Sequence, residues 1–283
     1  MNITTSTTCL KAGFFSAALG LVAWAAPASA TIIASDTFTS PNGTNLRDAG
    51  WSQVGATISD LASPVLIQNG TAVIQPAISG TNSIESVGLP FGQSISSGSI
   101  YVGIDINVAS LTTGVNTTLL YFGVNQAQSA PSATNAVGTV SLSPLSDGGY
   151  QIGISANFTT TTSALTFAET IFDFGTTYRL VFEYHFVEGE RNDTVTLSIG
   201  DTVVATAAWP ATTGTERNPS FLGIGAMTAA RPASLTLDNL VIATTYGEAA
   251  TAPVPEPATY AAIFGSLTLA GVLVARRRAR AAA

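Results

Sequence analysis

The sequence has very little of three residue types on which enzymes and metal sites commonly depend. Its 283 residues include a single cysteine, Cys9, a single histidine, His185, and a single lysine, Lys11. One cysteine excludes a disulfide scaffold and a site built from several thiolates, and one histidine leaves too few ligands for zinc. A serine or cysteine nucleophile paired with histidine has little support, and no Gly-x-Ser-x-Gly motif occurs.

Charge is also scarce, and most of it is negative. Charged residues make up 10% of the chain and apolar residues 46%, with a formal net charge of −7. A chain this apolar can bury enough surface to fold, so it is not intrinsically disordered. All acidic residues lie after Thr31, and the only basic residues between there and Pro255 are five arginines. This acidic surface excludes a general attraction to nucleic acid and could attract divalent cations.

The first 30 residues have the pattern of a secretory signal peptide. Lys11 supplies a positive charge, residues 12–26 form an apolar run, and Ala28-Ser29-Ala30 has the small-x-small form of a cleavage site. We therefore predict that signal peptidase cuts between Ala30 and Thr31. The cut removes Cys9, and a mature chain without a thiol suits an exported protein.

The C-terminal end has a motif, an apolar run and a basic tail in succession. Pro255-Glu256-Pro257 precedes residues 258–275, which carry no charge and are near the lower limit for a membrane-spanning helix. A basic cluster follows, made of Arg276, Arg277, Arg278 and Arg280. Basic clusters stay on the cytoplasmic side, so the rest of the chain is expected on the far side of the membrane. An ordinary C-terminal anchor would explain the same pattern.

Val254-Pro255-Glu256-Pro257-Ala258-Thr259, the apolar span and the arginine tail together resemble the PEP-CTERM sorting signal of Gram-negative bacteria. The resemblance covers about the last thirty residues. It implies recognition and cleavage by an exosortase near the Pro-Glu-Pro motif, after transient anchoring in the inner membrane by the helix 258–275. It also implies export to the cell surface, the outer membrane or the exopolysaccharide matrix. Pro255, Glu256 and Pro257 would then be substrate residues of another enzyme.

Residues 31–246 are expected to form one all-β domain, followed by a linker over 247–254. Short runs rich in Thr, Val, Ile and Tyr alternate with turns, and no sustained helical period occurs. Asn69-Gly70 separates two apolar runs and predicts a hairpin with a type I′ turn. Gly200-Asp201 joins a second pair of runs, 194–199 and 202–208. This pattern predicts an antiparallel β-sandwich.

The later strands resemble the concanavalin A-like, laminin-G-like jelly rolls. The resemblance rests on residues 178–184, on 192–197 with the Gly200-Asp201 turn, and on 235–242 as a closing strand. It implies that the closing strand pairs with the opening run 32–38. It also suggests a structural calcium ion held by hard oxygen ligands, for which Asp36, Asp238 and Asn239 are candidates. Asp238-Asn239 equally suits a simple turn.

Few residues suggest catalysis. Alternation along residues 179–187 places Glu183, His185 and Arg179 on one face, which suits a solvated strand face better than a pocket. Paired carboxylates are required of glycosidases, and the alternating acidic motif expected on this fold does not occur. Glu188 and Asp193 are expected to be solvated loop charges. Trp209, at a strand end, is the best candidate for an exposed sugar-stacking surface.

Two interpretations remain from the sequence. The first is an exported, non-enzymatic protein that binds exopolysaccharide or has a structural role in the matrix. The alternative is a divergent glycoside-active enzyme that uses Glu183 with a second carboxylate brought close by folding. Two carboxylates about 5–10 Å apart in one cleft would favour the enzyme.

Overall fold

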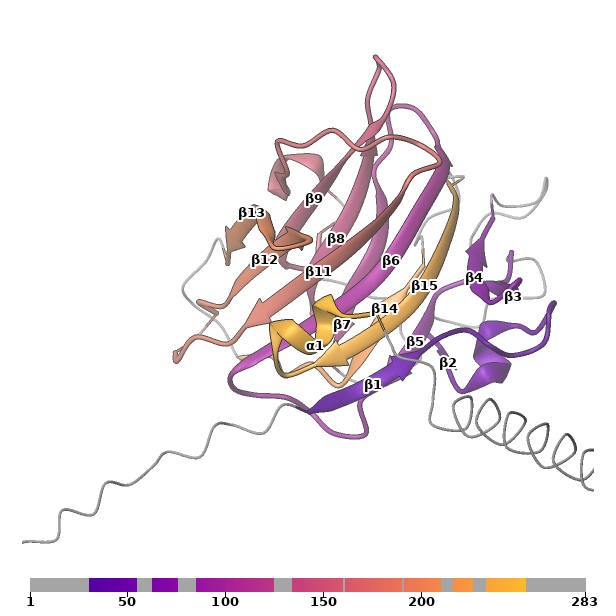
Figure 1. Ribbon diagram of the computed structural model, residues 1–283. Coiled ribbons are helices and arrows are strands. Elements are labelled where there is room, and N and C mark those ends of the chain that lie inside the picture. The colour runs from indigo at the N-terminus through magenta and orange to yellow at the C-terminus, as the bar shows by residue number, and fades with distance from the viewer. Residues whose placement is uncertain are drawn as a thin grey trace, which may run out of the picture.

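The computed structural model describes residues 31–252 except 55–62, 76–84, 125–133, 160, 190, 210–215 and 226–232. These residues form two antiparallel β-sheets packed face to face as a β-sandwich, as predicted. Figure 1 shows β6, β11 and β15 of one sheet crossing in front of β7, β8 and β9 of the other. The predicted signal peptide, the Pro-Glu-Pro motif and the helix 258–275 lie outside the described residues.

Sheet A has eight strands in the order β13-β12-β11-β6-β15-β4-β3, with β1 also paired to β15. Their bounds are β1 Ile32–Asp36, β3 Leu66–Gln68, β4 Thr71–Ile74, β6 Ser99–Leu111, β11 Thr177–His185, β12 Thr194–Ile199, β13 Thr202–Ala208 and β15 Ala233–Ala243. Sheet B has seven strands in the order β10-β9-β8-β7-β14-β5-β2. Their bounds are β2 Ser52–Gln53, β5 Val87–Pro90, β7 Thr117–Gly123, β8 Ala136–Pro144, β9 Tyr150–Asn157, β10 Thr166–Phe167 and β14 Phe221–Ile224. Two single-turn 3-10 helices, Leu46–Ala49 and Thr162–Ala164, lie in connections.

Both predicted hairpins are confirmed. Asn69 and Gly70 join β3 to β4 with φ angles of 53° and 76°, which a type I′ turn requires of both central residues. Gly200-Asp201 joins β12 to β13. The predicted closure of the domain is also confirmed, because β1 pairs antiparallel with the C-terminal half of β15.

The core lies between the two sheets and is filled by the inward-facing side chains of both. On β11, Leu180, Phe182 and Tyr184 are buried, while Glu183 and His185 face away from the core, as the alternation predicts. The Phe122 ring of sheet B stacks on Phe182 at 5.7 Å between centroids and meets Tyr184 edge-on at 5.8 Å. Aromatic pairs of this geometry add to the energy of burial. They join β7 to β11 across the sandwich.

One short helix, α1 (Tyr246–Ala250), packs against the outer face of sheet A. It includes residues 247–250, which the sequence analysis placed in a linker. A Cβ atom on Gly103 of β6 would lie 1.7 Å from the Ala249 carbonyl oxygen, so only glycine allows α1 to approach this closely. No helix in the described part of the chain is long and apolar enough to cross a membrane.

The close approach of α1 generates a test. We expect Gly103→Ala to displace α1 and to lower the free energy of unfolding by about 1–3 kcal/mol, the usual cost of overpacking. Gly247→Ala, in α1 itself, is the matched control because nothing lies within 4 Å of its Cβ position. It should leave stability unchanged or raise it by up to about 1 kcal/mol through helix propensity. Equal effects of the two variants in chemical denaturation would contradict this account.

Candidate functional site

A buried carboxylate organises one end of the sandwich, where β11 ends and β12 begins. Asp193 immediately precedes β12 and is only 1% exposed. Its Oδ2 accepts a 2.6 Å hydrogen bond from the Tyr184 hydroxyl, and its Oδ1 accepts a 2.9 Å bond from the Val187 N–H. The Trp209 N–H donates to the backbone carbonyl of Asp193, and the Trp209 indole N–H donates to the Tyr184 hydroxyl at 3.2 Å. Asp193 therefore ties three segments together.

Glu216 is a second carboxyl group at this end of the sandwich. Burial raises its pKa above the ordinary glutamate value, and the neighbouring carboxyl group of Asp193 raises it further. The backbone N–H groups of Arg217 and Arg191 oppose this shift. Its Oε2 atom is buried without a hydrogen-bond partner among the described residues. Glu216 therefore stays protonated to a higher pH than an exposed glutamate.

A cavity of about 380 Å³ adjoins this carboxyl group. It lies between the loop before β6 and the loop that joins β11 to β12. The lining residues are Ser96, Ser97, Gly98, Phe186, Val187, Glu188, Gly189 and Glu216. Two glutamates, Glu188 and Glu216, thus line one cavity, the first exposed and the second half-buried. A cavity with a perturbed acid in its wall is a candidate site for proton transfer.

Two arginines lie beside the same cluster. The guanidinium carbons of Arg191 and Arg217 are 5.4 and 5.7 Å from the centroid of the Trp209 ring, which is cation–π geometry. Burial lowers the pKa of Arg217, and the neighbouring charge of Arg191 lowers it further. The expectation of an exposed Trp209 is wrong: the residue is 9% exposed, because its indole turns inward to Tyr184.

Glu183 lies apart from this cluster, on the outer face of sheet A. The Ser99 hydroxyl donates to its Oε1 at 2.8 Å, and the same hydroxyl lies 2.8 Å from Nδ1 of His185. Glu183 is paired in register with Tyr101, whereas the next acid on this face, Asp105, is paired with Arg179, four residues along the strand. Four residues of a strand span about 13 Å, beyond the separation of a glycosidase carboxylate pair.

Two of the three calcium candidates, Asp238 and Asn239, lie near the guanidinium group of Arg179. It donates to the Asp105 carboxylate at 3.2 Å, to the Asn239 carbonyl at 2.5 Å and to the carbonyls of Ala249 and Thr251 in the C-terminal segment. The Asp36 carboxylate accepts from the Phe38 N–H and the Trp51 indole N–H. Asp238 accepts from the Asn239 N–H, as in a turn.

These oxygen atoms therefore already hold protein donors, an arrangement that does not suit a calcium ion. In the part of the chain that the structure describes, no group of three or more His, Cys, Asp or Glu side chains could hold a metal ion. The calcium ion stays a prediction from the resemblance, and no step below depends on it.

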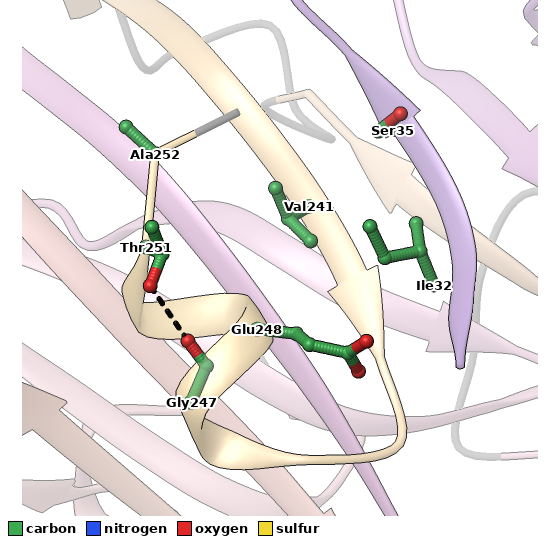
Figure 2. A pocket seen from close by; sticks show the side chains of 7 residues that line it. All are labelled: Ile32, Ser35, Val241, Gly247, Glu248, Thr251 and Ala252. Carbon is green, nitrogen blue, oxygen red and sulfur yellow. Dashed lines mark hydrogen bonds between the residues drawn. The ribbon is translucent and has the colours of Figure 1, made fainter. Parts of the chain in front are cut away.

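A second cavity, of about 480 Å³, lies beneath α1. Figure 2 shows Glu248 reaching into it between α1 and the strands β15 and β1, which contribute Val241 and Ile32. The Glu248 carboxylate accepts a hydrogen bond from the Thr245 hydroxyl. The other residues that line this second cavity are Ser35, Gly247, Thr251 and Ala252. With one carboxylate among these residues, this cavity suits acid–base chemistry less well than the first.

The sequence analysis missed most residues of the candidate site. Asp193 and Glu188 were expected to be solvated loop charges, and Asp193 is instead buried. Glu216 lies 23 residues beyond Asp193 in the chain, outside every strand. One signal was available in the sequence. Asp193 lies directly before a strand with alternating apolar residues, two positions before Val195, so it belongs to the face of that strand that points into the core.

No protein-family model matches the sequence, and no curated protein matches it. Solved structures share the fold. The alginate lyase Aly36B aligns with a TM-score of 0.50 and 14% identity over 74% of this chain and 95% of its own. A structure of the endo-acting O-glycanases that human gut bacteria express to initiate mucin breakdown aligns with a TM-score of 0.51 and 11% identity. It covers 75% of this chain and 98% of its own.

These comparisons overturn the expectation of a non-enzymatic matrix protein. The two solved proteins that share this fold are enzymes that act on carbohydrates, which is the class that the alternative interpretation names. Glu183, the carboxylate that this alternative named, lies on the outer face of sheet A, whereas Glu188 and Glu216 line the cavity.

The buried tyrosine–aspartate pair generates a test. We expect Tyr184→Phe to lower the free energy of unfolding by about 1.5–3 kcal/mol, because it removes a buried hydrogen bond to a charged group. Tyr150→Phe is the matched control, since the Tyr150 hydroxyl is equally buried and has no partner among the described residues. It should be neutral or stabilising. Equal losses from both variants would mean that the Asp193 bond adds nothing.

Proposed function

We propose that this chain is a carbohydrate-active enzyme that hydrolyses glycosidic bonds on a concanavalin A-like jelly roll. The observation that carries the proposal is the cavity with Glu188 and Glu216 in its wall, one of them with a raised pKa. The fold shared with an alginate lyase and an O-glycanase supports the proposal, because it shows that this scaffold can carry a carbohydrate-active site. Most glycoside hydrolases use two such carboxyl groups around the bond that breaks.

Glu216 is assigned as the general acid. Its carboxyl group is half-buried, and desolvation and the neighbouring Asp193 raise its pKa, which favours the protonated form. A protonated carboxyl in a cavity wall can donate its proton to the glycosidic oxygen as the bond to the anomeric carbon breaks. Asp193 is assigned as a positioning residue, since its bonds to Tyr184 and Val187 hold it against Glu216.

Glu188 is assigned as the general base. It is exposed in the loop after β11, a different segment of the cavity wall from the one that carries Glu216. There its carboxylate can accept a proton from water. The water oxygen then bonds to the anomeric carbon, while the leaving sugar keeps the proton from Glu216. The cavity, of about 380 Å³, has room for that water beside a sugar, as an inverting mechanism requires.

In our proposal this activity lies outside the cytoplasm, because the sequence has the pattern of a signal peptide at one end and of a sorting signal at the other. Signal peptidase would release Thr31 as the N-terminus, and an exosortase would process the chain near Pro255-Glu256-Pro257, leaving the domain at the cell surface or in the exopolysaccharide matrix. The sequence motifs quoted above support this route. Mass spectrometry of protein from its native cell should find a C-terminus near Pro255, whereas an intact arginine tail would indicate a plain membrane anchor.

The catalytic assignment is tested by replacing single carboxylates with amides. Against a panel of neutral and acidic polysaccharides, we expect the purified protein to generate new reducing ends. Glu216→Gln and Glu188→Gln should each lower kcat by about 10²–10⁴-fold, the usual contribution of a general acid or base. Glu183→Gln is the matched control, because its carboxylate lies on the outer face of sheet A, and it should keep full activity.

The pH profile separates catalysis from folding. Activity should fall as pH rises through the raised pKa of Glu216, since the acid must be protonated, and this limb should lie above the ordinary glutamate pKa of about 4.3. The residual activity of Glu216→Gln should lack that limb. Undiminished activity in Glu216→Gln, or a loss of activity in Glu183→Gln, would contradict the assignment, as would a wild-type protein that cleaves none of the panel.

A further inference from the structure

We infer that the cavity beneath α1 is a binding site for an ammonium group, and that the N-terminus of the mature chain occupies it. Removal of the signal peptide creates this group at Thr31, where it forms an ion pair with the Glu248 carboxylate and joins β1 to α1. The inference rests on the predicted cut between Ala30 and Thr31, which is part of the proposed export route, and is independent of the proposed hydrolysis.

The Glu248 carboxylate has no cationic partner among the residues that the structure describes. It accepts one hydrogen bond, from the Thr245 hydroxyl at 3.1 Å, and forms no ion pair with them. The other residues that line the cavity are uncharged, and Figure 2 shows Ile32 and Val241 beside the carboxylate. A half-buried carboxylate in such surroundings loses part of its hydration, which a nearby cation compensates.

Few side chains could supply that cation. The described part of the chain contains four arginines and no lysine, and none of the four lines this cavity. Arg179 reaches the neighbouring carbonyl groups of Ala249 and Thr251, but its ion pair is with Asp105. An α-amino group at the start of β1 is therefore the best candidate among these residues.

The Thr31 nitrogen lies close to Glu248. Its N–H donates to the Thr244 hydroxyl at 3.1 Å, and the Thr31 carbonyl accepts from the Thr244 N–H at 3.0 Å. The next residue, Thr245, binds Glu248 through its own hydroxyl. Ile32, which follows Thr31, lines the cavity, and Figure 2 shows the Glu248 side chain extending from α1 toward it. Two consecutive threonines thus connect the Thr31 nitrogen to the Glu248 carboxylate.

The cut changes the chemistry of this nitrogen. As the peptide bond breaks, the hydroxyl of a water molecule bonds to the Ala30 carbonyl carbon, and the Thr31 nitrogen takes the remaining proton. An α-amino group has a pKa of about 7.7–8.0, so at neutral pH it binds a further proton and becomes an ammonium group. The amide had one proton to donate, whereas the ammonium group has three and a positive charge. It can keep the Thr244 bond and also reach Glu248.

The scarcity of lysine allows a selective test. Lys11 is the only lysine and is removed with the signal peptide, so amine acetylation of the mature chain modifies the α-amino group alone. The chain 31–283 is released from an N-terminal fusion with Thr31 as its first residue and kept in detergent. We expect acetylation to speed hydrogen exchange in α1, read at the Ala249 amide that bonds to the Thr245 carbonyl, about twofold to fivefold.

A variant of the carboxylate locates the effect. In Glu248→Gln, α1 should exchange about twofold to fivefold faster than in the wild type before acetylation, and acetylation should change nothing further. Glu169→Gln is the matched control, because this glutamate is exposed in the connection between β10 and β11. It should match the wild type with and without acetylation.

The rate of acetylation is a second measurement, which does not depend on the stability of α1. A nearby carboxylate favours the protonated ammonium group, which does not react, so at pH 7 the wild type should react about twofold to fivefold more slowly than Glu248→Gln. Glu169→Gln should react at the wild-type rate. The other titratable groups at this end are Tyr101 of β6 and Tyr246 of α1, and burial raises the pKa of both, so neither changes charge at this pH.

Three outcomes would overturn the inference. They are an effect of acetylation that is absent in the wild type or equal in Glu248→Gln, equal acetylation rates in these two proteins, and a native protein whose first residue is not Thr31. None of these results bears on the hydrolysis of polysaccharides, and a wild type that cleaves none of them would leave the ion pair intact. The two proposals therefore fail separately.

Discussion

The buried carboxylate of Asp193 is the constraint on which the candidate site depends. A carboxylate 1% exposed is costly unless its lone pairs are satisfied. Here the satisfying donors come from the end of β11 and the loop after it, and the backbone carbonyl of Asp193 anchors Trp209 at the end of β13. The hydrogen bonds that offset the cost of burying Asp193 thus hold three segments together at the end of the sandwich where the cavity lies. The same negative charge raises the pKa of Glu216.

A second charge has a corresponding role on the outer face of sheet A. Arg179 is half-buried, and burial lowers its pKa while Asp105 and Asp238 oppose the shift. Its guanidinium group binds the bulged segment of β15 through the Asn239 carbonyl and holds α1 through that of Ala249. The bulge turns Asn239 to a φ of 50°, which asparagine tolerates, so that its amide also reaches Asp105. This face is therefore built for structure, and its oxygen atoms are already bonded.

The similarity to solved structures and the chemistry of the site answer different questions. At 11–14% identity, the shared sandwich with an alginate lyase and an O-glycanase shows the fold alone. The proposed reaction depends instead on Glu188 and Glu216, which line one cavity. The sandwich supplies rigid strand ends, and the loops between them supply the reactive groups, as is usual for scaffolds of this kind.

The amino-acid sequence by itself determined the elements whose signals are local. Asn69-Gly70 specified its hairpin through the positive φ angles of a type I′ turn, and the alternation along β11 specified which side chains enter the core. The pairing of the opening and closing strands was predicted through a resemblance. The residues of the site were not predictable in this way. Asp193, Trp209 and Glu216 are separated in the chain, and their carboxyl and indole groups have no periodic pattern that reveals a partner. The packing of the strand ends brought them together. The resulting burial and the approach of Asp193 raised the pKa of Glu216, because desolvation and this contact exist only once the chain has folded.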